Sequence, residues 1–295
     1  MTAAAPPHSA FEHIELSMQP GGIAVLRLAR PEAMNALNMP MVREMRRALD
    51  IVAGDSSARV LVLAAKGRGF CAGADLSGFP SKEEGDDKNE AAPPSRDEHA
   101  AKSAGDRVAE GMAHMWNPLM LAIRNFPLPT ISVVNGAAAG GGVGMALATD
   151  VTIAARSAYF VLTFTPTLGI CPDLSVTWQL NRRLGRGFAL PLALLGPRLY
   201  AEEAQRRQLI WEACDDDTLW QHAMELATRL AAVPPQAVRL VRDAVDSSTS
   251  SSLEAQLRTE MEAQRLLFND PESSALQEKT SRRFKEAAAR RRAKL

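Results

Sequence analysis

The 295-residue sequence is poor in cysteine, in aromatic residues and in net charge. Only Cys71, Cys171 and Cys214 are present, a scattered odd set that favours reduced thiols in the cytoplasm over a disulfide framework. Basic and acidic residues both number 34, which excludes a global positive field for nucleic acid. No apolar run is long enough to span a membrane, and no CxxC or HExxH spacing indicates zinc. We therefore expect a cytoplasmic globular protein with no metal, and with neither nucleic acid nor a membrane as partner.

Strand-like and helix-like patterns alternate along most of the chain. Strands are expected at about 13–17, 23–28, 60–65, 130–134, 151–155 and 159–162, and helices at about 40–51, 107–125 and 143–149. From about Ser175 the pattern is nearly all helical and ends in a segment rich in arginine and lysine. This order predicts an α/β core followed by a C-terminal helical layer.

Composition divides the chain into three regions. Residues 1–11 are a flexible leader of small residues and proline, residues 12–205 hold the α/β core, and residues 206–295 form the C-terminal helical region. Within the core, residues 79–104 contain KEEGDD and a pair of prolines, which indicates a mobile charged loop. A lid over a pocket is the functional alternative for this loop.

Two glycine-bearing segments follow predicted buried strands, GFCAGADL at 69–76 and NGAAAGGGVG at 135–144. Ligands of α/β folds usually bind at the carboxyl ends of strands, and glycine lets another group approach the backbone. The second segment matches neither a phosphate-binding loop nor a dinucleotide fingerprint. One backbone N–H from each segment, aimed at one point, would form an oxyanion hole. For either segment alone, tight helix–strand packing is the simpler explanation.

Taken in order, these motifs resemble the enoyl-CoA hydratase/isomerase (crotonase) superfamily. The matching pieces are RPEAMNAL (30–37), FCAGADL (70–76), NGAAAGGGVGMALATD (135–150), LGICPD (168–173) and DPESSALQEK (270–279). The resemblance implies an α/β spiral of ββα turns whose C-terminal helical region is used for trimerisation, often in a dimer of trimers. It also implies a CoA-thioester substrate, so coenzyme A is part of the substrate and no separate cofactor is expected.

The resemblance assigns the site residues by their positions in these motifs. The oxyanion hole would be the backbone N–H groups of Ala74 and Gly141, which would stabilise the enolate of the thioester. The implied substrate contacts are Ala33, Met34, Ala72, Asp75 and Leu76 along the CoA path, Phe164 and Thr165 where a second hydratase acid would stand, and Leu276 and Lys279 toward a neighbour's adenosine. For Lys279, a solvated helix charge is an equal alternative.

Both carboxylates that hydratases of this family use are missing. Their positions are occupied by Gly144 and by Thr165 (or Phe164), and none of these can move a proton. Asp173 matches the single carboxylate of the family's isomerases, both double-bond shifters and a ring isomerase. Such a base works best with its pKa raised toward neutrality by apolar neighbours. The neighbours available in the sequence are Leu162, Phe164, Leu168, Ile170 and Trp178.

Alternatives stay open for Asp173 and for the activity. Asp173 precedes the helical stretch 174–184, so it is also a candidate helix N-cap. The chain reads P-D-L-S-V where the family usually has P-D-S-G-G, which can change how the loop presents the carboxylate. The alternatives to an isomerase are a hydratase lacking both glutamates, an aryl-CoA dehalogenase-like hydrolase and an acyl-CoA binder without catalysis. Cys71 and His114 are interpreted as a packing residue and an ordinary helix residue.

Overall fold

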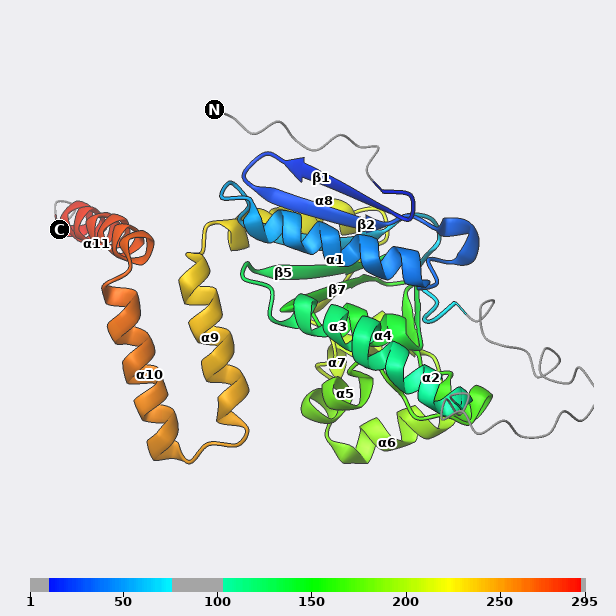
Figure 1. Ribbon diagram of the computed structural model, residues 1–295. Coiled ribbons are helices and arrows are strands. Elements are labelled where there is room, and N and C mark those ends of the chain that lie inside the picture. The colour runs from blue at the N-terminus through cyan, green and yellow to red at the C-terminus, as the bar shows by residue number, and fades with distance from the viewer. Residues whose placement is uncertain (1–10, 76–102, 293–295) are drawn as a thin grey trace, which may run out of the picture.

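The computed structural model of the protein describes residues 11–75 and 103–292 (Figure 1). Leu76 and nearly all of the loop predicted at 79–104 lie outside these ranges, as do residues 1–10 of the predicted leader. The described residues form two sheets that share a set of covering helices. Their arrangement places the two glycine-bearing segments at the centre of the fold.

Between residues 60 and 161, consecutive strands alternate between the two sheets. The larger sheet has the order β1 (Ile14–Gln19), β2 (Ile23–Leu28), β3 (Val60–Ala65), β5 (Thr130–Val134), β7 (Val151–Ala155) and β10 (Glu212–Cys214). The smaller has the order β4 (Gly69–Cys71), β6 (Ala137–Ala139), β8 (Tyr159–Val161) and β9 (Leu199–Tyr200). Pairing is parallel except for β1 with β2 and β8 with β9. The pairs β3–β4, β5–β6 and β7–β8 each place one strand in each sheet, which confirms the predicted spiral of ββα turns.

The first long helix shows why the sequence folds as predicted. Helix α1 (Met39–Gly54) begins after Asn38, whose side chain accepts a hydrogen bond of 2.9 Å from the backbone N–H of Met41. Pro40 stands in the first turn, where its missing N–H costs nothing. Met41 and Met45 share the buried face with four other apolar side chains. Burying one such methionine or leucine contributes roughly 1.5–3 kcal/mol, so this face fastens α1 to the core.

The remaining helices follow the expected order with shifted boundaries. They are α2 (Ala104–Gly111), α3 (Asn117–Arg124), α4 (Gly141–Leu147), α5 (Val176–Leu184), α6 (Arg186–Leu195), α7 (Ala201–Arg206), α8 (Leu219–Ala231), α9 (Pro235–Ser248), α10 (Leu253–Phe268) and α11 (Pro271–Arg292). The stretch predicted as one helix at 107–125 consists of α2, a π-helical turn (Met112–Trp116) and α3. Helix α4 begins two residues before the predicted Val143. No helix in the described ranges is both long enough and apolar enough to cross a membrane.

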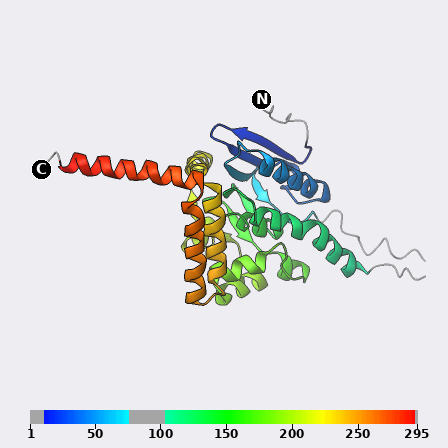
Figure 2. The same cartoon turned by 60° about the vertical axis from the view of Figure 1, so that its left-hand side comes forward.

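The C-terminal region both completes the core and extends from it. Strand β10 joins the larger sheet beside β7, and α8 packs on the strands of that sheet. Helices α9 and α10 then run side by side as an arm, and α11 projects outward from the body (Figures 1 and 2). Several large apolar side chains on the arm are exposed, among them Leu257, Met261 and Phe268.

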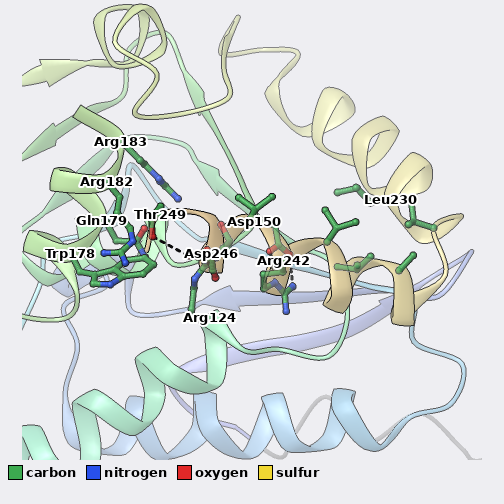
Figure 3. Close-up of a pocket in the computed structure, with 16 residues that line it drawn as sticks. Arg124, Asp150, Trp178, Gln179, Arg182, Arg183, Leu230, Arg242, Asp246 and Thr249 are labelled. Carbon is green, nitrogen blue, oxygen red and sulfur yellow. Dashed lines mark hydrogen bonds and ion pairs between the residues drawn. The ribbon is translucent and has the colours of Figure 1, made fainter. Parts of the chain in front are cut away.

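Ion pairs attach α9 to the core around a cavity of about 550 Å³ (Figure 3). Arg242 binds both oxygens of Asp150, at 2.8 and 2.7 Å, and Arg124 contacts Asp246 at 2.5 Å. Trp178 lies beneath Arg182, 4.0 Å from the guanidinium to the ring centre. None of the site residues predicted from the sequence lines this cavity, so we interpret it as part of the attachment of the arm.

Candidate active site

The two glycine-bearing segments are in direct backbone contact. Strand β4 pairs with β6, Gly69 opposite Ala137 and Cys71 opposite Ala138. A Cβ placed on Gly73 would lie 3.2 Å from the backbone nitrogen of Gly141. Gly73 also has a φ of +94°, a conformation that side chains rarely adopt. The two segments therefore lie side by side, as the sequence motifs implied.

The chain around Ala74 leaves one amide for a ligand. Leu37 donates its N–H to the carbonyl of Gly73 at 2.7 Å, and Asp75 donates its N–H to the carbonyl of Leu37 at 2.9 Å. The N–H of Ala74 takes part in neither bond. Within the described residues neither this N–H nor that of Gly141, the first residue of α4, has a hydrogen-bond acceptor. A helix N-terminus favours negative charge at its free amides.

The segment RPEAMNAL is held in place beside β4 by one buried amide. Asn35 is fully buried, and its side chain donates to the carbonyls of Lys66 and Gly69 at 2.8 and 2.9 Å. Its oxygen accepts the N–H of Arg30 at 2.9 Å. This arrangement places Ala33 and Met34 at the half-buried end of a 3₁₀ turn.

The predicted contacts Ala72 and Asp75 are joined to the same segment. Ala72 is exposed, and its backbone N–H donates to the carbonyl of Met34 at 3.0 Å. Asp75 accepts a hydrogen bond of 2.9 Å from the guanidinium of Arg30, and both side chains are mostly buried. The carboxylate and the backbone N–H of Asp75 are thus both engaged within the chain.

Helix α4 is packed closely at both ends. A Cβ on Gly142 would lie 2.3 Å from the carbonyl oxygen of Cys71, so only glycine allows this approach. At the other end Arg183 donates to the carbonyl of Leu147 at 2.7 Å, which places a cation at the negative end of the helix. Burial, with repulsion from Arg124, lowers the pKa of Arg183 to about 10. Burial raises the pKa of the Cys71 thiol to about 12, consistent with its interpretation as a packing residue.

Asp173 is a partly buried carboxyl before helix α5. Among the described residues its buried Oδ1 has no hydrogen-bond partner, and burial raises the pKa of the group above its ordinary value of 3.8. A bond from its own backbone amide opposes that rise in smaller measure. The alternative of a helix N-cap is wrong, because α5 begins at Val176 after Ser175 and has no side-chain cap. A carboxyl with a desolvated oxygen and a raised pKa is a candidate for acid–base chemistry.

The loop that carries Asp173 is braced by the predicted residues Phe164 and Thr165. The Thr165 hydroxyl donates to the carbonyl of Ile170 at 3.0 Å, and a Cβ on Gly140 would lie 3.6 Å from the ring of Phe164. Of the apolar neighbours expected around Asp173, Leu162 and Phe164 are buried. Leu168, Ile170 and Trp178 are more than a third exposed, so they do not provide the expected apolar enclosure.

Comparison with known proteins identifies the family. The sequence profile described as enoyl-CoA hydratase/isomerase matches residues 18–291. The chain belongs to the enoyl-CoA hydratase/isomerase family. It is 39% identical over 247 residues, 83% of this chain and 86% of the relative, to the 1,2-epoxyphenylacetyl-CoA isomerase of Escherichia coli (strain K12).

Other relatives carry hydratase names. A Rhodobacter capsulatus protein named "probable enoyl-CoA hydratase" is 39% identical over 249 residues, 82% of this chain and 85% of that protein. The crystal structure of an enoyl-CoA hydratase from Bacillus anthracis superposes with a TM-score of 0.74 at 29% identity, covering 88% of this chain and 92% of that chain. The family thus acts on CoA thioesters, and relatives of both reaction types resemble this chain.

Within this family site, Gly144 shows a feature that the sequence did not reveal. A Cβ placed on Gly144 would lie 2.0 Å from the carbonyl oxygen of Leu174, and one on Gly141 would lie 2.1 Å from a methyl carbon of Leu174. Leu174 and Ser175 both have positive φ, +49° and +64°. This conformation costs a residue other than glycine roughly 1–2 kcal/mol. The sequence signal was the departure from the family's P-D-S-G-G, in which Leu174 replaces a serine and Ser175 and Val176 replace the two glycines.

Leu276, Lys279 and His114 lie outside this cluster. Leu276 and Lys279 are exposed on α11, which projects away from the body (Figure 2), so contact with a substrate would require a second copy of the chain. His114 is exposed in the π-helical turn, consistent with an ordinary helix residue.

One group of potential metal ligands was not foreseen. Atoms of Glu212, Cys214 and His222 lie within 4.8 Å of one another. The His222 and Glu212 side chains are already joined by a contact of 3.0 Å, which satisfies them without an ion.

Proposed function

We propose that this protein is a CoA-thioester isomerase in which Asp173 moves a proton and the backbone amides of Ala74 and Gly141 bind the thioester oxygen. The observation that carries this proposal is the partly buried Asp173 carboxyl, with an unpartnered Oδ1, next to Leu174, which packs on Gly141. Support also comes from the relative of E. coli that is named an isomerase. One acid beside an oxyanion hole suffices to shift a double bond, whereas hydration in this family is expected to need two.

The reaction proceeds by removal and return of one proton. With a 3-enoyl-CoA, the Asp173 carboxylate takes a proton from C2, and the electrons of that C–H bond form the dienolate. The two amides stabilise the negative charge on the thioester oxygen, where one such donor is typically worth roughly 2.7–4 kcal/mol. The protonated Asp173 then delivers the proton to C4. The C3–C4 double bond becomes a C2–C3 double bond, and the reaction neither consumes nor releases water.

A comparison of rates with different substrates tests the proposal. Purified protein receives a 3-enoyl-CoA and a 2-enoyl-CoA separately, with an epoxide of an aryl-acetyl-CoA as a third arm suggested by the name of the E. coli relative. We expect the 3-enoyl bond to shift, or the epoxide to isomerise, and the 2-enoyl-CoA to remain unhydrated. Efficient hydration without either isomerisation contradicts the proposal and supports the hydratase alternative. Chloride release from a halobenzoyl-CoA would instead indicate the dehalogenase alternative.

The pH dependence of isomerisation should report Asp173. Since the base must be ionised and burial raises its pKa above 3.8, kcat should fall about tenfold per pH unit below a midpoint above that value. The same raised pKa means that the folded protein binds more protons than the unfolded chain between the two pKa values. Its contribution to stability therefore decreases as the pH rises through that window. Initial rates between pH 4 and 9 measure the midpoint, and a flat profile down to pH 4 would contradict the assignment.

The active form is proposed to be a homotrimer or a dimer of trimers. Exposed apolar side chains on the arm, such as Leu257 (56%), Met261 (66%) and Phe268 (67%), support burial against another copy. In such an assembly Leu276 and Lys279 on α11 would be available to the CoA bound by a neighbour.

A further inference from the structure

Leu174 lies between the proposed acid and the helix that carries a proposed oxyanion donor. Its side chain is 4% exposed, and one of its methyl carbons lies where a Cβ of residue 141 would stand. Its carbonyl oxygen occupies the place of a Cβ at residue 144. Leu174 therefore fits against α4 only because both of these positions are glycine.

A local hydrogen bond of 3.0 Å, from the N–H of Val176 to the carbonyl of Asp173, closes the turn that contains Leu174 and Ser175. Leu174 and Ser175 both stand in the left-handed region, and the Ser175 hydroxyl is buried without a hydrogen-bond partner. Backbone in such a conformation persists where the surroundings determine it, and it is concentrated at functional sites. The buried Leu174 side chain packs this turn against Gly141.

We propose that Leu174 is a positioning residue that wedges the Asp173 loop against Gly141 and Gly144, fixes the carboxyl for proton transfer and closes the place where a second acid or its water would act. The inference rests on the proposed isomerase function and extends it. It explains why Gly144 is glycine: the residue makes room for the Leu174 carbonyl. A glutamate at 144 would displace the loop instead of restoring a hydratase.

The Leu174 wedge is also expected to limit the access of water to the Asp173 carboxyl. Among the described residues, the influences on the pKa of Asp173 are burial and its own backbone amide, with no charged side chain among them. Water admitted by loss of the Leu174 side chain should therefore lower that pKa, and no neighbouring charge would mask the change. A residue that served stability alone would not move the pH profile.

The test compares variants at residues 174 and 144. Leu174→Ala and Leu174→Gly should lower kcat by about 10- to 100-fold with little change in KM, since small displacements of a catalytic group have effects of this size. Both should also move the acid limb of the kcat profile to lower pH. Glycine adopts the positive φ of residue 174 without strain, so Leu174→Gly should still fold. Leu174→Met conserves volume and should keep kcat within about twofold of wild type.

Two glycine-to-alanine variants, one at residue 144 and one at a control position, form a matched pair. Gly144→Ala places a methyl group against the Leu174 carbonyl and should lower kcat by about 100-fold. Gly187→Ala, in α6, adds the same methyl group where no atom lies within 4 Å, and should leave kcat and KM unchanged. Circular dichroism and melting curves establish that each variant is folded before rates are compared.

The outcomes separate this inference from the proposed function. If Asp173→Asn is inactive while Leu174→Gly and Gly144→Ala keep the wild-type kcat and pH midpoint, the wedge is wrong and the isomerase proposal stands. If Asp173→Asn still isomerises, the proposed function itself is wrong. Reduced kcat with a lowered midpoint in Leu174→Gly, and wild-type behaviour in Leu174→Met, support the wedge.

Discussion

Replacing Asp173 with asparagine is expected to lower the rate of isomerisation by about 10³-fold, within the range that general acid–base catalysis typically contributes. Asparagine keeps the shape of the side chain and removes only its ability to take up and return a proton. The Asp173 Oδ1 has no partner to lose, so the structural cost of the change is small. Single-turnover rates with a 3-enoyl-CoA, at saturating substrate, measure the loss directly.

Stability provides the control for this variant. Burial of the ionised Asp173 raises its pKa, so at neutral pH the charge opposes folding. We therefore expect Asp173→Asn to melt at or above the wild-type temperature at pH 7 while its activity is lost. Binding of the CoA ester should be nearly unchanged. A variant that melts well below wild type would indicate a structural role for the carboxyl and would oppose the catalytic assignment.

Replacing Asn35 with alanine is expected to destabilise the protein by about 3–4 kcal/mol. Three hydrogen bonds of Asn35 are lost, each worth about 1 kcal/mol net, and the buried carbonyl of Gly69, the part-buried carbonyl of Lys66 and the N–H of Arg30 lose their partner. The backbone at Asn35 also has a φ of +54°, which asparagine tolerates better than alanine. For a chain of this size the melting temperature should fall by about 10 °C.

Asn38→Ala is the matched control for that variant. Asn38 also uses its side chain for a backbone N–H, at the start of α1, but it makes this single bond and is less buried. Its loss should cost about 1 kcal/mol. Thermal melts at one fixed protein concentration compare the two. Equal losses for both variants would show that Asn35 does not organise the segment beside β4. We also expect KM for the CoA ester to rise in Asn35→Ala alone.

Residue patterns along the sequence determined the secondary structure of the core. The apolar run at 60–65, the Asn38 cap with its amphipathic helix and the strand at 130–134 all formed as predicted, because each depends on local periodicity and turn chemistry. The glycines at 73 and 142 marked the close approach of the two segments, since backbone atoms of the opposite segment leave no room for a side chain there. These signals, with the family motifs, sufficed for the spiral fold and the class of substrate.

Tertiary structure decided what the pattern around Asp173 could not. In sequence, a carboxyl just before a helix can be either a helix cap or a catalytic acid. The sequence does not fix the start of a helix to within two residues, and it does not show whether a carboxyl oxygen is exposed to water. The start of α5 at Val176 excludes the helix cap, and the Oδ1 of Asp173, which has no partner among the described residues, supports the proposed role as an acid. Likewise, only the tertiary structure shows that the Leu174 carbonyl occupies the space beside Gly144 where a side chain would stand. The two residues are 30 positions apart in the sequence and meet through backbone atoms, which no residue pattern encodes.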